Sequence, residues 1–214
     1  MNWMSLISIP IACLLGSIPS AFLVAKYNGK IDIRDEPDGR ISAAAVYRRV
    51  GLLSFLMVVT MDIGKAALAV LIAQWLNADA LIVMLAGVVA IASHQWSMFL
   101  KFQGGLGSTT MGGVLVCVAT IPVIIGAAVA AILAWKTKKS TVSFAVGIIT
   151  IVIVLFAMQW SKIPSLPILI ASPSLPPPLT SYHVLIAYPL VLLLMMMMKN
   201  IQIKYRPGAP LKTK

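Results

Sequence analysis

Residues 112–135, with the sequence GGVLVCVATIPVIIGAAVAAILAW, decide how this chain is organised. The stretch carries no charge and is long enough to cross a bilayer once, because about 20 apolar residues span the hydrocarbon core. Pro122 interrupts it near the middle, and a proline inside a helix removes a backbone hydrogen bond. The stretch therefore forms either one kinked crossing or two short helices, 111–120 and 123–135, that enter the membrane and return.

The distribution of positive charge favours the pair of short helices. Membrane proteins keep lysine and arginine in their cytoplasmic loops. If the N-terminus is outside and the stretch is a hairpin, 15 of the 17 lysines and arginines are cytoplasmic, in residues 26–50, 100–110, 136–141 and 199–214. A single crossing would instead divide them evenly. We therefore expect an all-α polytopic membrane protein of about seven transmembrane helices, two of them short, with a cytoplasmic C-terminus.

The composition of the whole chain agrees with this class. Of the 214 residues, 60% are hydrophobic and only 11% are charged, against about 25% charged in an ordinary soluble domain. Together with the mean hydropathy of +0.96, this excludes a soluble enzyme, a disordered chain and a disulfide scaffold. We expect one integral membrane domain over residues 1–214, with its other spans at 4–25, 51–76, 80–99, 142–160 and 182–198.

A glycine-rich segment, Gly104-Gly105-Leu106-Gly107-Ser108-Thr109-Thr110, follows Lys101 on the expected cytoplasmic side. Glycines allow backbone N–H groups to approach an anion closely, and the N-terminus of the following helix adds a partial positive charge. The hydroxyl groups in the segment can add further donors. The segment is a candidate phosphate cradle, although a flexible turn that only aids helix packing explains the same residues.

Polar residues at or inside the expected spans form the second group of candidates. Asp62 and Lys65 lie three residues apart on one helix face. Intramembrane charges usually face a functional interior, but a structural ion pair between helices is an equal alternative. His94, at the cytoplasmic end of the third span, could be a general base, a phosphate ligand or an interfacial histidine without such a role. Arg34 and Arg48, in a cytoplasmic loop, are suited to phosphate binding or simply fix the topology.

Several short motifs occur in a fixed order along the chain. Residues 16–21 read GSIPSA, residues 32–34 read DIR, residues 37–48 read PDGRISAAAVYR and residues 99–107 read FLKFQGGLG. In this order they resemble motifs of the bacterial acyl-phosphate:glycerol-3-phosphate acyltransferase family, namely GSIPxA, DIR, GSGNIGATNVxR and FLKFKGGKG. Shorter elements of that family, DxxKG, GHxxP, a serine pair and HxxNI, resemble the surroundings of Asp62 and Lys65, His94, Ser140 and Ser143, and Asn200.

The resemblance implies a multi-pass enzyme of the bacterial plasma membrane with its active site facing the cytoplasm. Its reaction moves an acyl group from acyl phosphate to the 1-hydroxyl of glycerol 3-phosphate, giving lysophosphatidic acid for phospholipid biosynthesis. We expect no cofactor and no metal. The expected partners are the two substrates, membrane lipid and other phospholipid-synthesis enzymes, and not nucleic acid, because topology explains the net charge of +11.

The resemblance also carries roles to individual residues. It implies a catalytic role for Arg48, His94, Lys101, Ser140, Ser143 and Asn200. It implies phosphate binding by Lys65, Gly104, Gly105, Gly107 and Thr110, and the residue pattern adds Arg34 and Ser108 to this group. Two further residues are expected to support the site, Asp62 and Ser17.

The chain departs from the family motifs at several of these places. Leu106 stands where the family has lysine, Ala44 and Ala45 replace threonine and asparagine, and Met197 replaces the histidine of HxxNI. Removing one preorganised donor from an active site costs about 10²–10³ in rate. Two hypotheses follow. The protein is a divergent enzyme that still acylates glycerol 3-phosphate, or it is a catalytically impaired relative that binds a lipid phosphate or a partner protein.

Overall fold

The structure is a computed structural model that describes residues 3–35, 41–76, 78–161 and 182–204. All regular secondary structure in this part of the chain is helical. Six helical stretches are long and apolar enough to cross a membrane, and a shorter apolar helix, Ser108–Val118, accompanies them. The expected all-α membrane class is therefore confirmed. The six stretches are Ser5–Asn28, Leu52–Trp75, Ala80–Leu100, Thr120–Thr137, Thr141–Trp160 and Ile186–Ile203.

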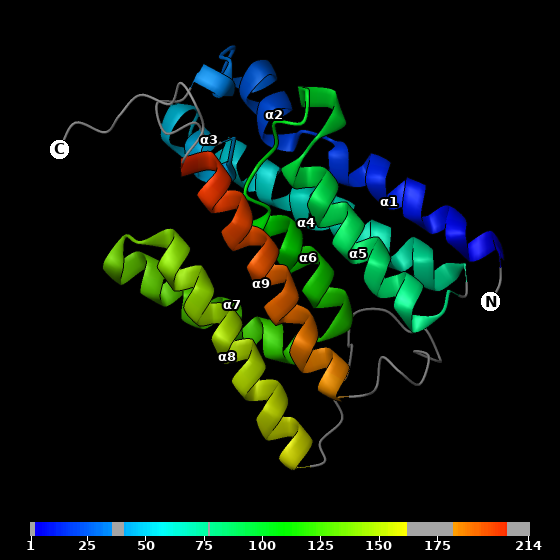
Figure 1. The fold of residues 1–214 in the computed structure, drawn as a ribbon. Helices are drawn as coiled ribbons and strands as arrows, with labels where there is room; N and C mark the ends of the chain where they lie inside the picture. Colours follow the sequence, from blue (N-terminus) through cyan, green and yellow to red (C-terminus); the bar gives the residue numbers. More distant parts are fainter. Residues whose placement is uncertain (1–2, 36–40, 77, 162–181, 205–214) are drawn as a thin grey trace.

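Figure 1 shows the helical elements in their order along the chain. The first half contains η1 (Trp3–Ile7), α1 (Ser8–Ser17), α2 (Ser20–Asn28), η2 (Ile33–Asp35), α3 (Ala43–Arg49), α4 (Leu52–Trp75) and α5 (Ala80–Gln95). The second half contains η3 (Met98–Leu100), α6 (Ser108–Val118), α7 (Thr120–Thr137), α8 (Ser140–Trp160) and α9 (Tyr182–Lys204).

The segment that decided the topology forms two helices, α6 and α7, that run in opposite directions (Figure 1). The prediction of two helices is confirmed, but the break lies at Ala119 and not at Pro122. Pro122 sits in the first turn of α7, where the missing N–H costs little because first-turn donors have no partner within the helix. The Thr120 hydroxyl donates to the Val116 carbonyl at 2.8 Å and so satisfies an acceptor at the end of α6.

The first span also contains a break, which the expected continuous segment 4–25 did not include. α1 ends at Ser17, and Pro19 precedes the first residue of α2. Proline has no N–H to continue the helical ladder. The carbonyl of Ile18 lies in this break, where it accepts from the N–H of Ser20 at 3.0 Å, and its second lone pair can accept from a side chain of another helix. The break therefore creates an acceptor inside the membrane-spanning part of the molecule.

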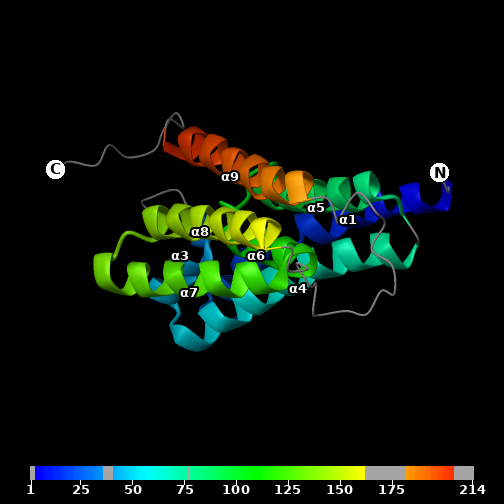
Figure 2. The ribbon, with the colours of Figure 1, turned by 90° about the horizontal axis from the view of Figure 1, so that it is seen from below.

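Small residues bring the central helices together. A Cβ on Gly16 of α1 would overlap the backbone of Ala90 in α5, and one on Gly113 of α6 would overlap the backbone of Ile63 in α4. Such close approach is typical of helix pairs in membranes. Figure 2 shows the α7–α8 turn, the C-terminal end of α9 and the short helix α3 toward one end of the molecule, while α1 begins at the other.

Candidate active site

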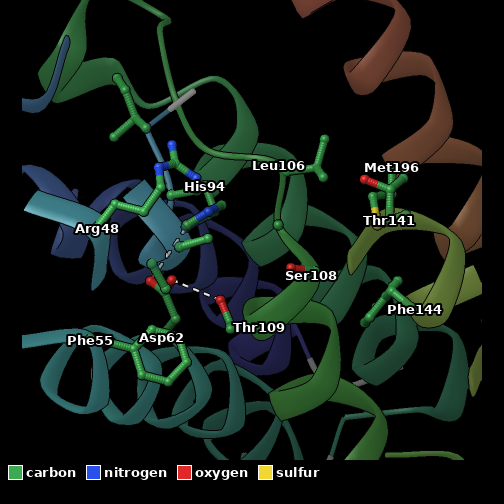
Figure 3. Close-up of a pocket in the computed structure, with 15 residues that line it drawn as sticks. Arg48, Phe55, Asp62, His94, Leu106, Ser108, Thr109, Thr141, Phe144 and Met196 are labelled. Atoms are coloured by element: carbon green, nitrogen blue, oxygen red, sulfur yellow. Dashed lines mark hydrogen bonds and ion pairs between the residues drawn. The ribbon is translucent and has the colours of Figure 1, made fainter. Parts of the chain in front are cut away.

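A cavity of about 200 Å³ lies where α3, α4, α5, α6, α8 and α9 converge (Figure 3). One side is polar, and Arg48, Asp62 and His94 contribute to it. The apolar side chains of Leu106, Phe144 and Met196 lie away from these charged groups, together with Thr141, whereas Phe55 lies beside Asp62. The remaining lining residues of the cavity are Ile41, Ser42, Ala43, Ala44, Gly107, Ser108 and Thr109. The cavity lining therefore combines charged groups with apolar side chains, as a site for an amphiphilic ligand would.

Arg48 reaches the cavity from the last turn of α3. Ser42 begins this helix, and its hydroxyl oxygen accepts a hydrogen bond from the N–H of Ala45 at 3.2 Å, as in a typical N-cap. Arg48 is the one lysine or arginine among the residues that line this cavity. Arg48, which the sequence analysis predicted as a site residue, thus supplies the fixed positive charge of the cavity. Residues 37–40 of the same motif lie outside the described residues.

Asp62, Lys65 and His94 form a buried polar cluster next to the cavity. The Lys65 Nζ lies 2.8 Å from Asp62 Oδ1 and 2.9 Å from His94 Nδ1. The side chains of Lys65 and Asp62 are 5% and 3% exposed, so water does little to screen their attraction. The structure therefore brings together three predicted residues, with Asp62 and His94 facing the cavity.

The break in the first span completes the surroundings of Lys65. Its ammonium donates to the carbonyl of Ile18 at 2.7 Å and to the hydroxyl of Ser20 at 3.2 Å. The sequence had pointed to Ser17 of the GSIPSA motif as the supporting residue, but the motif reaches the cluster through Ile18 and Ser20. The signal was Pro19, which predicts a helix break at this position.

Gly104 and Gly105 serve a packing function in this structure. Their N–H groups donate to the carbonyls of Gln95 at 3.1 Å and His94 at 3.2 Å, and a Cβ on either glycine would overlap the end of α5. The Gln95 amide also donates to the carbonyl of Leu106 at 3.0 Å. These contacts hold the glycine segment against α5, and the two amides expected to meet phosphate are already engaged.

The end of the glycine segment opens into the cavity. Gly107 has a φ of +86° and stands at the N-cap of α6, where no side chain makes a capping bond. Ser108 and Thr109 follow and line the cavity. First-turn N–H groups have no acceptor within their own helix, so this helix start offers donors to an anion. Thr110 is fully buried and does not line the cavity.

Thr109 was noted in the sequence only as a possible donor, and the structure gives it a definite partner. Its hydroxyl donates to Asp62 Oδ2 at 2.8 Å, which ties the start of α6 to α4 (Figure 3). Ser42 and Thr141 also line the cavity, although no signal in the sequence distinguished them from other small polar residues. The spacing of residues along the chain does not show which helix faces pack together around a cavity, so these contacts could not be predicted from it.

Several predicted residues lie outside the cavity lining. Lys101 is exposed, with a positive φ of 52° at the end of η3. Arg34 pairs with Asp32 on the surface, where its guanidinium lowers the pKa of Asp32 to about 2 through hydrogen bonds. Neither residue is among those that line the cavity.

Ser143 and Asn200 lie close in sequence to residues that line the cavity and are not among those lining residues. Ser143 is buried, and its hydroxyl donates to the carbonyl of Lys139 at 3.0 Å. Ser140 is the first residue of α8, and its side chain is outside the described part of the structure. Asn200 follows Met196 by one turn of α9. Of the four residues that depart from the family motifs, Leu106 and Ala44 line the cavity. The other two do not: Ala45 is fully buried, and Met197 is 52% exposed.

Within the described residues, no group of three or more His, Cys, Asp and Glu side chains gathers in a way that could hold a metal ion. The charged and hydrogen-bonding groups at the cavity include Arg48, the start of α6 and the buried cluster. These groups bind and orient anions.

The family profile described as glycerol-3-phosphate acyltransferase matches residues 6–206 of the chain. The chain belongs to this family. A family member from Thermoanaerobacter pseudethanolicus, named glycerol-3-phosphate acyltransferase, is 35% identical over 154 residues, which cover 71% of this chain and 76% of the relative.

Other relatives match over a smaller part of their length. Glycerol-3-phosphate acyltransferase 2 of Moorella thermoacetica is 40% identical over 118 residues, covering 55% of this chain and 60% of the relative. Glycerol-3-phosphate acyltransferase 4 of Dehalococcoides mccartyi is 37% identical over 120 residues, or 56% of this chain and 52% of the relative. The chain thus spans between half and two thirds of these two relatives.

The fold is also that of a solved family structure. The crystal structure of PlsY (YgiH), an integral membrane glycerol 3-phosphate acyltransferase in its glycerol 3-phosphate form, superimposes with a TM-score of 0.71. The likeness covers 92% of this chain and 90% of that protein at 22% identity. This comparison supports the arrangement of helices that builds the cavity.

Proposed function

We propose that this protein is a membrane acyltransferase that transfers an acyl group from acyl phosphate to the 1-hydroxyl of glycerol 3-phosphate. The observation that carries the proposal is the cavity, which joins Arg48 and the uncapped start of α6 to an apolar side formed by α8 and α9. Such a site fits substrates that combine phosphate with an acyl chain. Family membership and the names of the relatives support the same activity.

The chemistry of the step is a direct acyl transfer. The hydroxyl oxygen of glycerol 3-phosphate attacks the acyl carbonyl carbon, the bond from that carbon to the phosphate oxygen breaks, and the hydroxyl proton leaves with the released phosphate. Arg48 would bind a phosphate through two N–H groups. The N–H groups at the start of α6 would stabilise negative charge, and the apolar side would receive the acyl chain. Positioning and electrostatics then supply the rate enhancement.

We also propose that the cavity faces the cytoplasm of a bacterial cell. Lys136, Lys138 and Lys139 lie at the α7–α8 turn, toward the same end of the molecule as α3 (Figure 2), and cytoplasmic loops are the positive ones. A Lys139→Cys variant tests this in intact cells. A membrane-impermeant thiol reagent should not label it before the cells are opened, and labelling from outside would contradict the assignment.

Activity is tested with the purified protein in detergent or bilayers, with acyl phosphate and glycerol 3-phosphate as substrates. Formation of lysophosphatidic acid is expected, and Arg48→Ala should lower kcat/KM by about 10²-fold or more, because the charge-assisted bonds to phosphate are lost. Arg49→Ala is the matched control, since Arg49 is an exposed arginine next in sequence that does not line the cavity. An equal loss in both variants would contradict the role of Arg48.

A second function, binding without turnover, is favoured by Leu106 and Ala44 in the cavity lining. They place apolar side chains where the family motif has lysine and threonine. The variant Leu106→Lys separates the two functions. Wild-type turnover supports the enzyme, whereas a silent wild type with an active Leu106→Lys variant indicates an impaired enzyme. If both are silent and glycerol 3-phosphate or lysophosphatidic acid still binds, the protein is a binding protein.

A further inference from the structure

The imidazole of His94 is held by the buried cluster on one side and faces the glycine segment on the other. Its Nδ1 lies 2.9 Å from the Lys65 ammonium. Its Nε2 is so close to Gly105 that a Cβ built there would lie 2.5 Å away. His94 also lines the cavity, on the same wall as Arg48 (Figure 3). The two ring nitrogens therefore have different surroundings.

The contact with Lys65 determines which nitrogen carries the proton. Lys65 is the cation of an ion pair, because the Asp62 carboxylate lies 2.8 Å from its Nζ. An ammonium group has only donors, so the Nδ1 of His94 must be the acceptor in this contact. The ring proton then belongs on Nε2. Asp62 Oδ1 is 3.6 Å from Nδ1, which is beyond ordinary hydrogen-bond distance, so Asp62 does not hold a proton on Nδ1.

The rest of the cluster keeps this arrangement in place. Asp62 is fixed on its other oxygen by the Thr109 hydroxyl at 2.8 Å. Lys65 is fixed by the carbonyl of Ile18 and the hydroxyl of Ser20. Contacts from the break between α1 and α2, from α2, from α4 and from α6 thus set the direction in which Lys65 donates. An imidazole that keeps its Nδ1 lone pair on Lys65 and its proton on Nε2 cannot accept another proton.

We propose that His94 acts in this site as a fixed hydrogen-bond donor, presenting Nε2–H to an anionic oxygen of the bound substrate, and not as a general base. This inference rests on the proposed function for its substrate, since phosphate and the developing oxyanion are the anions that the reaction brings to the cavity. It selects one of the three roles that the sequence left open for this residue. It also assigns a task to Lys65, which sets the tautomer of His94 and does not meet the substrate itself.

The protonation of the ring can be measured without turnover. The chain contains two histidines, His94 and His183, so the variant His183→Gln leaves a single imidazole. In bilayers at pH 7, ¹⁵N-histidine solid-state NMR of this variant should show a protonated nitrogen assigned to Nε2 and an unprotonated nitrogen assigned to Nδ1. A proton on Nδ1, or on both nitrogens, would overturn the proposal whether or not the protein turns over.

Kinetics test the role itself. His94→Gln retains an N–H donor near the position of Nε2 but has no basic nitrogen, whereas His94→Ala has neither. The expected kcat/KM of His94→Gln lies within about tenfold of wild type, and that of His94→Ala falls by about 10²–10³, the usual cost of removing one preorganised donor. Equal losses in the two variants would overturn the donor role. An inactive wild type would count against the proposed function, while the NMR result would still stand.

Discussion

Two aspartates in this protein pair with a cation two or three residues further along the chain, and their surroundings differ completely. Asp32 and Arg34 lie on the surface at η2, with 34% and 45% of their side chains exposed. Asp62 and Lys65 lie inside α4, with 3% and 5% exposed. In sequence both read as short charged motifs, DIR and DxxK. Burial, which spacing alone does not reveal, decides that one pair is local and the other joins several helices.

The contacts of the two cations show what this difference means. Arg34 binds Asp32 and lies over the ring of Phe22, with its Cζ 5.1 Å from the ring centre. Lys65 binds Asp62 and also groups from α5 and from the break between α1 and α2. A surface pair exchanges water contacts for protein contacts at little net gain, whereas a buried ion needs every partner that the fold provides.

The largest expected effect comes from breaking the buried pair on one side. Lys65→Met leaves the Asp62 carboxylate buried without its cation, which destabilises a protein by about 3–5 kcal/mol. The measurement is unfolding in detergent micelles, with Lys101→Met as the control because Lys101 is exposed. A loss no larger than that of the control would show that the cluster is not a structural centre of the fold.

Removing both charges should cost less than removing one. The double variant Asp62→Leu/Lys65→Met leaves no isolated ion, and exchanging a buried pair for apolar residues is often close to neutral. We expect it to recover at least half of the stability lost in Lys65→Met while acyl transfer stays low, because His94 has lost the donor that sets its tautomer. Stability as low as in the single variant would mean that the remaining polar groups need the pair.

The spans were predictable from sequence because apolar periodicity and charge are local properties. The charge count also predicted the reversal between α6 and α7, since it placed Lys136, Lys138 and Lys139 on the same side as Lys101. The details of the site required the tertiary structure. Gly104 and Gly105 read as phosphate donors, but their amides bind carbonyls at the end of α5. That pairing depends on the path by which the chain returns, which no local pattern records.

The same limit applies to the cavity lining. Arg48, Asp62 and His94 were identified in the sequence because charge in an apolar chain is conspicuous and because the motifs resemble those of the family. Thr109 and Ser20 bind the buried pair, but hydroxyl residues are common in membrane helices and their partners come from other elements. Polar residues that act by contact across helices are therefore the part of the site that sequence analysis identifies least well.

A smaller effect is expected from a partner of the buried lysine. Ser20→Ala removes one of several acceptors around the Lys65 ammonium and should cost about 1.5–3 kcal/mol, the range of a hydrogen bond to a charged group. The same substitution in the Lys65→Met background should cost little, because the ammonium is absent. A double-mutant cycle measures this coupling, and equal costs in the two backgrounds would show that Ser20 acts independently of Lys65.

The smallest effect is expected at the surface pair. Arg34→Ala should cost less than about 1 kcal/mol at pH 6, because exposed ion pairs contribute little.

The pH dependence of this cost shows whether it comes from the ion pair. The hydrogen bonds from Arg34 lower the pKa of Asp32 from 3.8 to about 2, so the pair stabilises the folded state above pH 3.8 and this contribution disappears as the pH falls through about 2. The unfolding midpoints of wild type and Arg34→Ala should therefore differ slightly at pH 6 and coincide near pH 2. A difference that persists at low pH would show that Arg34 acts through the Phe22 ring, which carries no titrating group, and the comparison with the buried pair would then be one of packing and not of charge.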